Sequence, residues 1–169
     1  MLRLSIGLLT GVSFALIATG AALSGDDLPL RKAGRWELKT VMDEGMGPRE
    51  QTLTMCVDAE MERNTAAASA AEHKQSCTKY QVSKADGATI VDATCNMNGR
   101  DVESRTEMKG DFQSSFAIKI DSTTSGIEGA QSVSVKRTIT QDGKFLGDSC
   151  GDLKAGEAMG PDGTKIMVQ

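Results

Sequence analysis

Aromatic residues and runs of basic residues are scarce in this chain, and both shortages restrict what it can be. Phe, Tyr and Trp make up 4% of its 169 residues, so a core must be built mainly from Val, Ile, Leu and Met. The 23 acidic residues outnumber the 19 basic ones, which form no run. Nucleic-acid-binding domains and proteins attracted to anionic membranes both need basic patches. We therefore expect neither nucleic acid nor an anionic membrane surface as a partner.

Histidine is almost absent, and no Cys-x-x-Cys pair occurs. The single histidine, His73, has no neighbouring cysteines or carboxylates at the spacing that zinc sites use. Asp142, Asp148 and Asp152 lack the spacing of a calcium-binding loop. The nine methionines are better explained by core packing than by a copper site, because several alternate with polar residues along strand-like segments. We expect no metal and no cofactor.

Residues 1–24, in contrast, are strongly apolar. Arg3 precedes the apolar residues 4–18, and a run of small residues then ends in Ala22-Leu23-Ser24. This is the pattern of a secretory signal peptide with an A-x-S cleavage site. A transmembrane helix needs about 20 apolar residues, and no cysteine follows the run to carry a lipid. We predict cleavage between Ala22 and Gly25, export to the periplasm and no membrane anchor afterwards. Loss of Arg3 would bring the net charge to about −5.

Alternation of apolar and polar residues dominates the rest of the chain. A period of two residues is typical of half-buried strands. The alternating segments are residues 33–42, 49–56, 79–83, 91–97, 101–109, 112–120, 133–139 and 144–146. Asp86-Gly87 and Asn98-Gly99 are strong hairpin signals, and Gly110-Asp111 and Asp142-Gly143 are also expected to be turns. Residues 121–130, rich in Ser, Thr and Gly, are expected to form a loop.

One segment, residues 58–73, breaks the alternation and predicts a short helix. Asp58 is a good N-cap, and Glu60 and Glu62 suit the first turn of a helix. Because helices and strands do not alternate along the chain, a parallel sheet is disfavoured. We predict an all-β fold with one short helix: an antiparallel meander of about eight strands that forms a strongly curved sheet or a barrel.

The predicted organisation is therefore a signal peptide followed by one ordinary domain. Residues 25–32 are expected to form a flexible leader, residues 33–151 a single β-domain, and residues 152–169 a loose C-terminal tail. A core with so few aromatic residues would be helped by disulfides, each of which contributes about 2–4 kcal/mol.

The four cysteines, Cys56, Cys77, Cys95 and Cys150, predict two disulfides in an exported protein. Strand alternation places Cys56 and Cys77 on polar faces, whereas Cys95 shares an apolar face with Val91. Residues on opposite faces of a sheet cannot be bridged. We therefore predict the pairs Cys56–Cys77 and Cys95–Cys150, unless a bulge between Gly87 and Cys95 changes the register.

Several short motifs resemble one known family. They are Ala33-Gly34-Arg35-Trp36-Glu37, Cys56-Val57-Asp58 and Lys144-Phe145-Leu146-Gly147-Asp148-Ser149-Cys150. Together with the spacing of Cys77 and Cys95 around a hairpin, they resemble the bacterial "domain of unknown function 3617" family over residues 30–151. Ser149 departs from the Gly-Asp-Cys sequence expected there. The resemblance implies an exported, mostly antiparallel protein and no known activity.

The segment Gly147–Gly151 matches the G-x-S-x-G motif of serine hydrolases. With His73 and an aspartate such as Asp92 or Asp101, Ser149 would complete the order of a chymotrypsin-like triad. However, a nucleophile elbow needs a strand-to-helix turn in an α/β sheet, and no helical pattern follows Ser149. About 145 residues are too few for two barrels. A serine hydrolase is the least favoured function, and we expect no enzyme and no catalytic residue.

The favoured function is non-enzymatic binding of a small apolar ligand or a protein partner by an exported β-domain. Trp36, Phe112 and Phe116 are the candidates for facing a ligand, because a small barrel either holds one ligand or is filled by side chains. The residues expected on the inner face are Trp36, Met55, Val82, Phe112, Phe116, Ile118 and Val135. We expect a mostly filled interior, since no convergent polar groups would orient a ligand. The alternative function is an inhibitor of envelope hydrolases, or a structural accessory, acting through residues 121–130.

Overall fold

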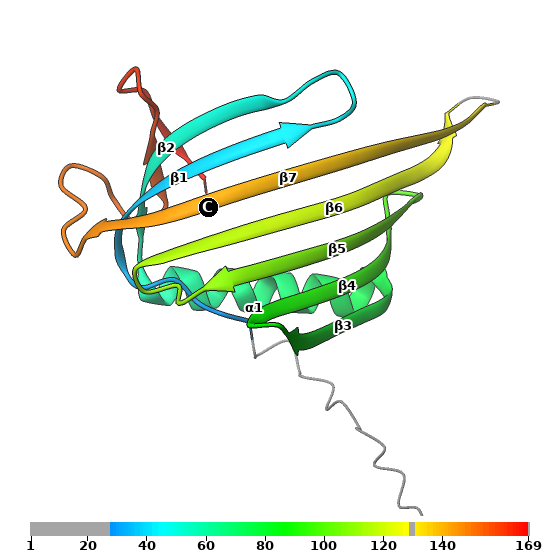
Figure 1. Cartoon of the computed structure of the whole chain (residues 1–169), viewed down its shortest axis with the longest axis horizontal. Coiled ribbons are helices and arrows are strands. Elements are labelled where there is room, and N and C mark those ends of the chain that lie inside the picture. Colours follow the sequence, from blue (N-terminus) through cyan, green and yellow to red (C-terminus); the bar gives the residue numbers. More distant parts are fainter. Residues whose placement is uncertain (1–27, 129–130, 169) are drawn as a thin grey trace, which may run out of the picture.

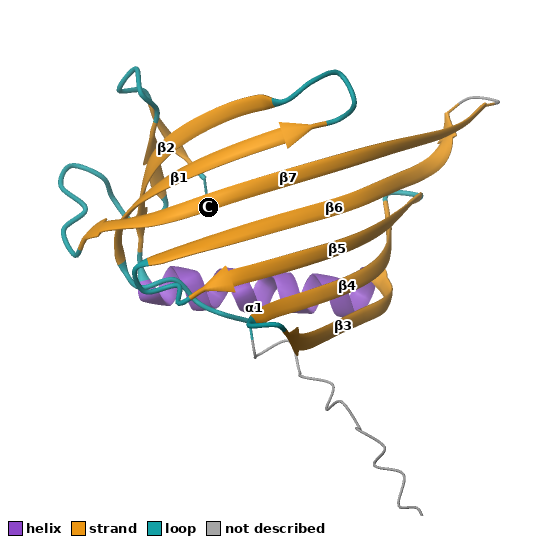
Figure 2. Cartoon of the chain, in the orientation of Figure 1, coloured by secondary structure: helices purple, strands orange, loops and turns teal. Residues whose placement is uncertain are grey.

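The computed structural model describes residues 28–128 and 131–168, and shows one curved antiparallel sheet with a single helix (Figures 1 and 2). The elements are β1 (Gly34–Asp43), β2 (Arg49–Val57), α1 (Ala59–Ser76), β3 (Cys77–Ala85), β4 (Ala88–Met97), β5 (Arg100–Gly110), β6 (Ser115–Glu128), β7 (Gln131–Gly147), β8 (Glu157–Met159) and β9 (Lys165–Met167). The strand order is β3-β4-β5-β6-β7-β1-β2-β8-β9. The predicted fold class is confirmed, and the sheet is open rather than closed. The predicted signal peptide lies outside the described residues.

The hairpins β3–β4 and β4–β5 form where the sequence predicts them. Their turns, Asp86-Gly87 and Asn98-Gly99, have positive φ at both residues. This backbone matches the right-handed twist of the flanking strands, and Asx-Gly pairs adopt it at the least cost. These two turns fix the register of the β3–β4–β5 part of the sheet.

Strands β6 and β7 are longer than the sequence pattern indicates. Residues 121–128 continue β6 and pair with β7, so the predicted loop at residues 121–130 is wrong over its described part. The predicted turn at Asp142-Gly143 is also wrong, because β7 runs straight through it. Gly143 serves a different purpose: a Cβ there would overlap the ring of Phe116 on the neighbouring strand. The glycine allows close packing on the face of the sheet rather than a turn.

The main core occupies one end of the inner face of the sheet. Its buried residues are Trp36, Leu38, Met55, Val57, Phe112, Phe116 and Ala158, with Leu53, Met61, Met108, Ile118 and Phe145 packed against them. Trp36 lies 5.4 Å from the rings of Phe116 and Phe145, measured between centroids. Of the predicted inner-face residues, Val82 is also buried, but Val135 is 46% exposed because it lies on the far half of β7, away from this core.

The helix α1 confirms the predicted segment and extends three residues further. Asp58 caps it, accepting hydrogen bonds from the backbone N–H groups of Glu60 and Met61 at 2.9 and 3.0 Å. These hydrogen bonds hold the pKa of Asp58 below its ordinary value. At its other end, His73 packs against Tyr80 of β3, with 4.6 Å between ring centroids. The helix therefore runs from the core towards the β3 edge, along one side of the sheet (Figure 2).

Both predicted disulfide pairs are wrong. The disulfides join Cys56 to Cys150 and Cys77 to Cys95. In the β3–β4 register Lys79 lies opposite Thr94 but Cys77 lies opposite Cys95, which makes Thr78 an extra residue. This bulge moves Cys77 onto the face that holds Cys95. The prediction allowed for a bulge on β4, whereas the structure has it on β3. The two disulfides are typical of an oxidising compartment.

The segment after Cys150, which the sequence predicts to be a loose tail, forms two short strands that pack on the domain. Strand β8 pairs with β2 and β9 pairs with β8. Leu153 and Ala158 are 7% and 0% exposed, and Ala158 belongs to the core around Trp36. The Cys56–Cys150 disulfide fastens the start of this segment to β2. The C-terminal hairpin thereby covers the end of the core that the eight predicted strands would leave open.

Candidate inner groove

A cavity of about 280 Å³ lies between α1 and the inner face of the sheet, beside the core. We call it the inner groove. Its lining residues are Leu28, Pro29, Leu30, Arg31, Glu62, Thr65, Ala66, Ser69, Met108, Phe112, Phe116, Ile118 and Gln141. Ligand pockets typically have volumes of about 300–1,000 Å³ and mostly apolar walls. The inner groove therefore has the size and lining for one small, largely apolar molecule.

The inner groove exists because α1 presents small side chains to the sheet. Thr65, Ala66 and Ser69 recur at helical spacing on the side that lines the cavity. The opposing wall carries larger apolar side chains, Met108 and Ile118 among them. A helix with leucines at those positions would fill this space, as in an ordinary amphipathic packing. Helix α1 therefore leaves a space between itself and the sheet instead of filling it.

An ion pair between Arg31 and Glu62 closes one side of the inner groove. Arg31 donates from Nε and Nη2 to the two Glu62 carboxylate oxygens at 2.9 and 2.6 Å, and its backbone N–H donates to the same carboxylate at 3.1 Å. The side chains are 14% and 10% exposed. A buried pair is tolerated when its hydrogen bonds are satisfied, and breaking one is strongly destabilising. Sequence patterns did not indicate this pair, which joins residues 31 positions apart.

The described part of the predicted flexible leader is held against the domain. Residues 28–31 line the inner groove, and the backbone N–H of Lys32 donates to the carbonyl of Phe112 at 2.8 Å. The carbonyl of Lys32 in turn accepts from Trp36 Nε1 at 2.8 Å. Residues 28–32, which the sequence assigns to a flexible leader, therefore contact the domain in the structure. This segment forms one wall of the groove.

Three neutral polar side chains, those of Thr65, Ser69 and Gln141, line the inner groove among its apolar side chains. Gln141 donates from Nε2 to Thr40 Oγ1 at 3.0 Å, which leaves its carbonyl oxygen as an acceptor. Ser69 contacts Nδ1 of His73 at 3.3 Å. A few placed polar groups in an apolar pocket orient a ligand without requiring it to be charged. The inner groove has both an apolar surface and such polar groups.

The turn between β5 and β6 positions the two phenylalanines of the inner groove. Phe112 has φ of 56°, which is rare for a bulky residue, and its ring stacks on Phe116 at 4.9 Å between centroids. Asp111 holds this turn: its carboxylate accepts from three backbone N–H groups, of residues 113–115, at 2.8–3.1 Å. It also accepts from the hydroxyl of Ser114 at 2.8 Å.

Acid is expected to weaken the Asp111 turn. Hydrogen bonds from the backbone of Ser114 and Gln113 lower the pKa of Asp111 below its ordinary value. A carboxyl with a lowered folded-state pKa stabilises the fold above its unfolded pKa of about 4, and this contribution is lost as the pH falls below that value. Between about pH 5 and pH 2.5 the wild type should therefore lose more stability than Asp111→Asn, measured as urea midpoints. Parallel losses in the two proteins would contradict this role.

Two of the three residues predicted to face a ligand lie at the inner groove. Phe112 and Phe116 line the inner groove. Trp36 does not: it is 0% exposed and is buried in the core behind them. The sequence also gave no indication of the helix residues, of Gln141 or of residues 28–31, which all reach the groove through long-range packing. The alternation of apolar and polar residues indicated only those groove residues that belong to the sheet and to the turn between β5 and β6.

Ser149 and His73 lie on separate parts of the molecule. His73 packs on β3, whereas Ser149 follows β7, and three strands separate β3 from β7. Neighbouring strands are about 4.8 Å apart, so neither side chain is within hydrogen-bonding reach of the other. Ser149 Oγ instead accepts from the backbone N–H of Gly151 at 3.3 Å within an exposed turn. The structure does not bring together the triad that the sequence order suggested.

A larger hollow, of about 560 Å³, lies across β3–β7 and is mostly polar. Several of its polar groups bind one another: Arg105 donates to Asp92 at 3.0 Å, and the Thr138 hydroxyl donates to Asp121 at 2.8 Å. Such a surface is unsuited to an apolar molecule. In residues 28–128 and 131–168, no group of three or more His, Cys, Asp or Glu side chains is arranged to hold a metal. Over the same residues, the helix is not apolar enough to span a membrane.

Comparisons with known proteins identify a family without assigning an activity. The model of the family described as "Protein of unknown function (DUF3617)" matches residues 31–150. This match confirms the resemblance seen in the sequence motifs and covers more than half of the chain. No curated protein matches the chain, and no solved structure matches it.

Proposed function

Because this chain belongs to the DUF3617 family of unknown function, we propose a role from the geometry alone: it binds a small apolar molecule in the inner groove. The observation that supports the proposal is the cavity of about 280 Å³ between α1 and the sheet. Its walls combine Met108, Phe112, Phe116 and Ile118 with three neutral polar side chains. This is the arrangement expected of a binding site for a small, largely apolar ligand.

The proposal includes export to the periplasm and excludes catalysis. Two disulfides agree with the oxidising compartment to which a signal peptide at residues 1–24 would direct the chain. The inner groove holds one acid–base pair, Arg31 and Glu62, and the two groups bind each other rather than an open space. The alternative role as a hydrolase inhibitor relied on a loop at residues 121–130, most of which is strand β6.

Filling the inner groove from the helix should abolish ligand binding. Ala66 lines the cavity, whereas its neighbour Ala67 is exposed on the opposite side of α1. Ala66→Leu adds three carbons inside the groove, and Ala67→Leu adds them in solvent. Crowding a pocket by even one methylene costs about 10–200-fold in affinity. We expect 1-N-phenylnaphthylamine, an apolar fluorescent probe, to bind Ala66→Leu at least about tenfold more weakly than the wild type.

The matched variant separates this effect from a general one. Ala67→Leu should bind the probe as the wild type does, because alanine and leucine are both good helix formers. Urea unfolding should show that Ala66→Leu remains folded. Unchanged binding by Ala66→Leu, or no binding by the wild type, would refute the proposed function.

A further inference from the structure

The inner face of the sheet changes from apolar to polar along strand β6. The inward residues in chain order are Phe116, Ile118, Ile120, Ser122, Thr124 and Gly126. The first two line the inner groove. Antiparallel strands rise about 3.4 Å per residue, so Thr124 lies about 20 Å along the strand from Ile118, on the same face. The apolar groove is thus one end of a longer graded surface.

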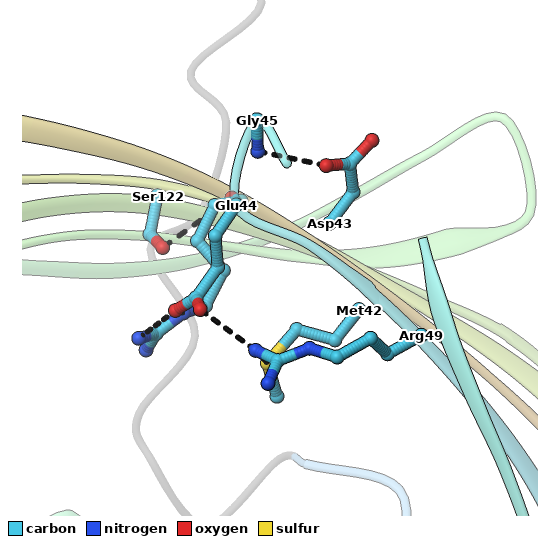
Figure 3. Close-up of polar contacts among 7 residues, drawn as sticks. Met42, Asp43, Glu44, Gly45, Arg49 and Ser122 are labelled. Atoms are coloured by element: carbon cyan, nitrogen blue, oxygen red, sulfur yellow. Dashed lines mark hydrogen bonds and ion pairs between the residues drawn. The ribbon is translucent and has the colours of Figure 1, made fainter. Parts of the chain in front are cut away.

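Arginines gather at the polar end of this surface. Glu44, which directly follows β1, is bound by two of them. Arg137 Nε donates to its carboxylate at 2.7 Å. Arg49 Nη2 donates to the same carboxylate at 2.8 Å (Figure 3). The register places Arg137 opposite Ser122. One carboxylate therefore faces two guanidinium groups, which leaves an excess of positive charge.

A third arginine, Arg100, adds to this excess. Its side chain packs over Gly126, where a Cβ would lie 3.1 Å from Arg100 Cγ. Among the side chains that the structure describes, Arg100 has no ion-pair partner. Arg100, Arg137 and Glu44 line a cavity of about 400 Å³ together with Val133 and Val135. We call this second cavity the arginine end.

From this placement we propose that the ligand is an anionic amphiphile: its apolar part lies in the inner groove and its anionic group binds Arg100 and Arg137. The inference rests on the proposed function, since it assigns the chemical class of the molecule bound in the same groove. Hydrogen bonds from a guanidinium to an oxyanion are among the strong polar contacts in proteins, and Arg forms them in pairs. The spacing of the two cavities requires an extended molecule.

Two probes with the same apolar part, one anionic and one neutral, test the assignment. A dansyl-labelled undecanoic acid carries the anionic group, and its methyl ester lacks it. We expect the wild type to bind the acid at least about tenfold more tightly than the ester, a difference that corresponds to about 1.4 kcal/mol. Raising the salt concentration should weaken binding of the acid and leave the ester unchanged.

Variants at exposed positions locate the charge effect. Arg100→Met removes the unpaired guanidinium and should abolish the preference for the acid without changing ester binding. Lys84→Met removes an exposed charge on β3, at the edge of the sheet, and should keep the preference. Competition by dodecanoate and by dodecyl phosphate then distinguishes a carboxylate from a phosphate head group.

The outcomes separate this inference from the proposed function. Equal binding of acid and ester by the wild type, or a preference that survives in Arg100→Met, would overturn the anionic amphiphile while leaving an apolar ligand in place. If neither probe binds, both the anionic amphiphile and the proposed binding of an apolar molecule are refuted.

Discussion

Replacing Cys56 and Cys150 together by serine is expected to lower the free energy of unfolding by about 4–5 kcal/mol. The disulfide closes a loop between residues 94 positions apart, and in the loop-closure model longer loops give larger losses of unfolded-state entropy. It also fastens the C-terminal hairpin, whose Ala158 is part of the core. Urea denaturation followed by Trp36 fluorescence measures the effect.

The second disulfide provides the matched comparison. Cys77–Cys95 spans 18 residues, and its removal should cost about 3 kcal/mol. It lies at the end of α1, away from the C-terminal hairpin. A larger loss for this pair than for Cys56–Cys150 would contradict the assigned role of the long-range bridge.

Truncation of Phe116 to alanine should destabilise the protein by about 3–5 kcal/mol. The ring is 4% exposed, lies 5.4 Å from Trp36 and 4.9 Å from Phe112, and fits over Gly143. Phe116 lines the inner groove from one side only, and its other contacts belong to the core. The truncation would therefore remove most of the contacts of the ring and leave a cavity in the core.

Ile127→Ala is the control for Phe116, because Ile127 is 78% exposed on the same strand. Surface changes of this kind stay within about 0.5 kcal/mol. Chemical denaturation read through Trp36 fluorescence compares the two variants. A loss of less than about 1.5 kcal/mol for Phe116→Ala would show that the groove, rather than a packed core, surrounds the ring.

The sequence was sufficient to predict those parts of the fold that depend on interactions between residues close in the chain. The Asx-Gly turns, the capped helix after Asp58 and the alternating strands required no knowledge of distant contacts. The sequence-based predictions were wrong where the same residue type is common in two kinds of structure. Gly143 suggests a turn by composition but provides room for Phe116, and the serines and threonines of residues 121–128 suit a strand once β7 pairs with them.

The site was predictable on one wall only. Phe112 and Phe116 stood out because alternation exposes the apolar face of a strand. The bulge at Thr78, which reassigns the disulfides, has no signature in a single sequence, because a one-residue shift is invisible until both strands are paired. The Arg31–Glu62 pair and the role of the small side chains of α1 could not be predicted either, because both depend on how the helix packs on the sheet.

The central position of β1 has a consequence for how the protein folds. The first strand of the domain lies between β7 and β2. The sheet is therefore continuous only after residues 34–43 have paired with residues 138–147. The β3–β4–β5 hairpins, by contrast, join neighbours in the chain and are able to form early. Pairing across a hundred residues raises the contact order, and such topologies fold slowly. While the chain is being synthesised, β1 emerges first and pairs with β7 only near the end, which leaves Trp36 exposed for most of the process.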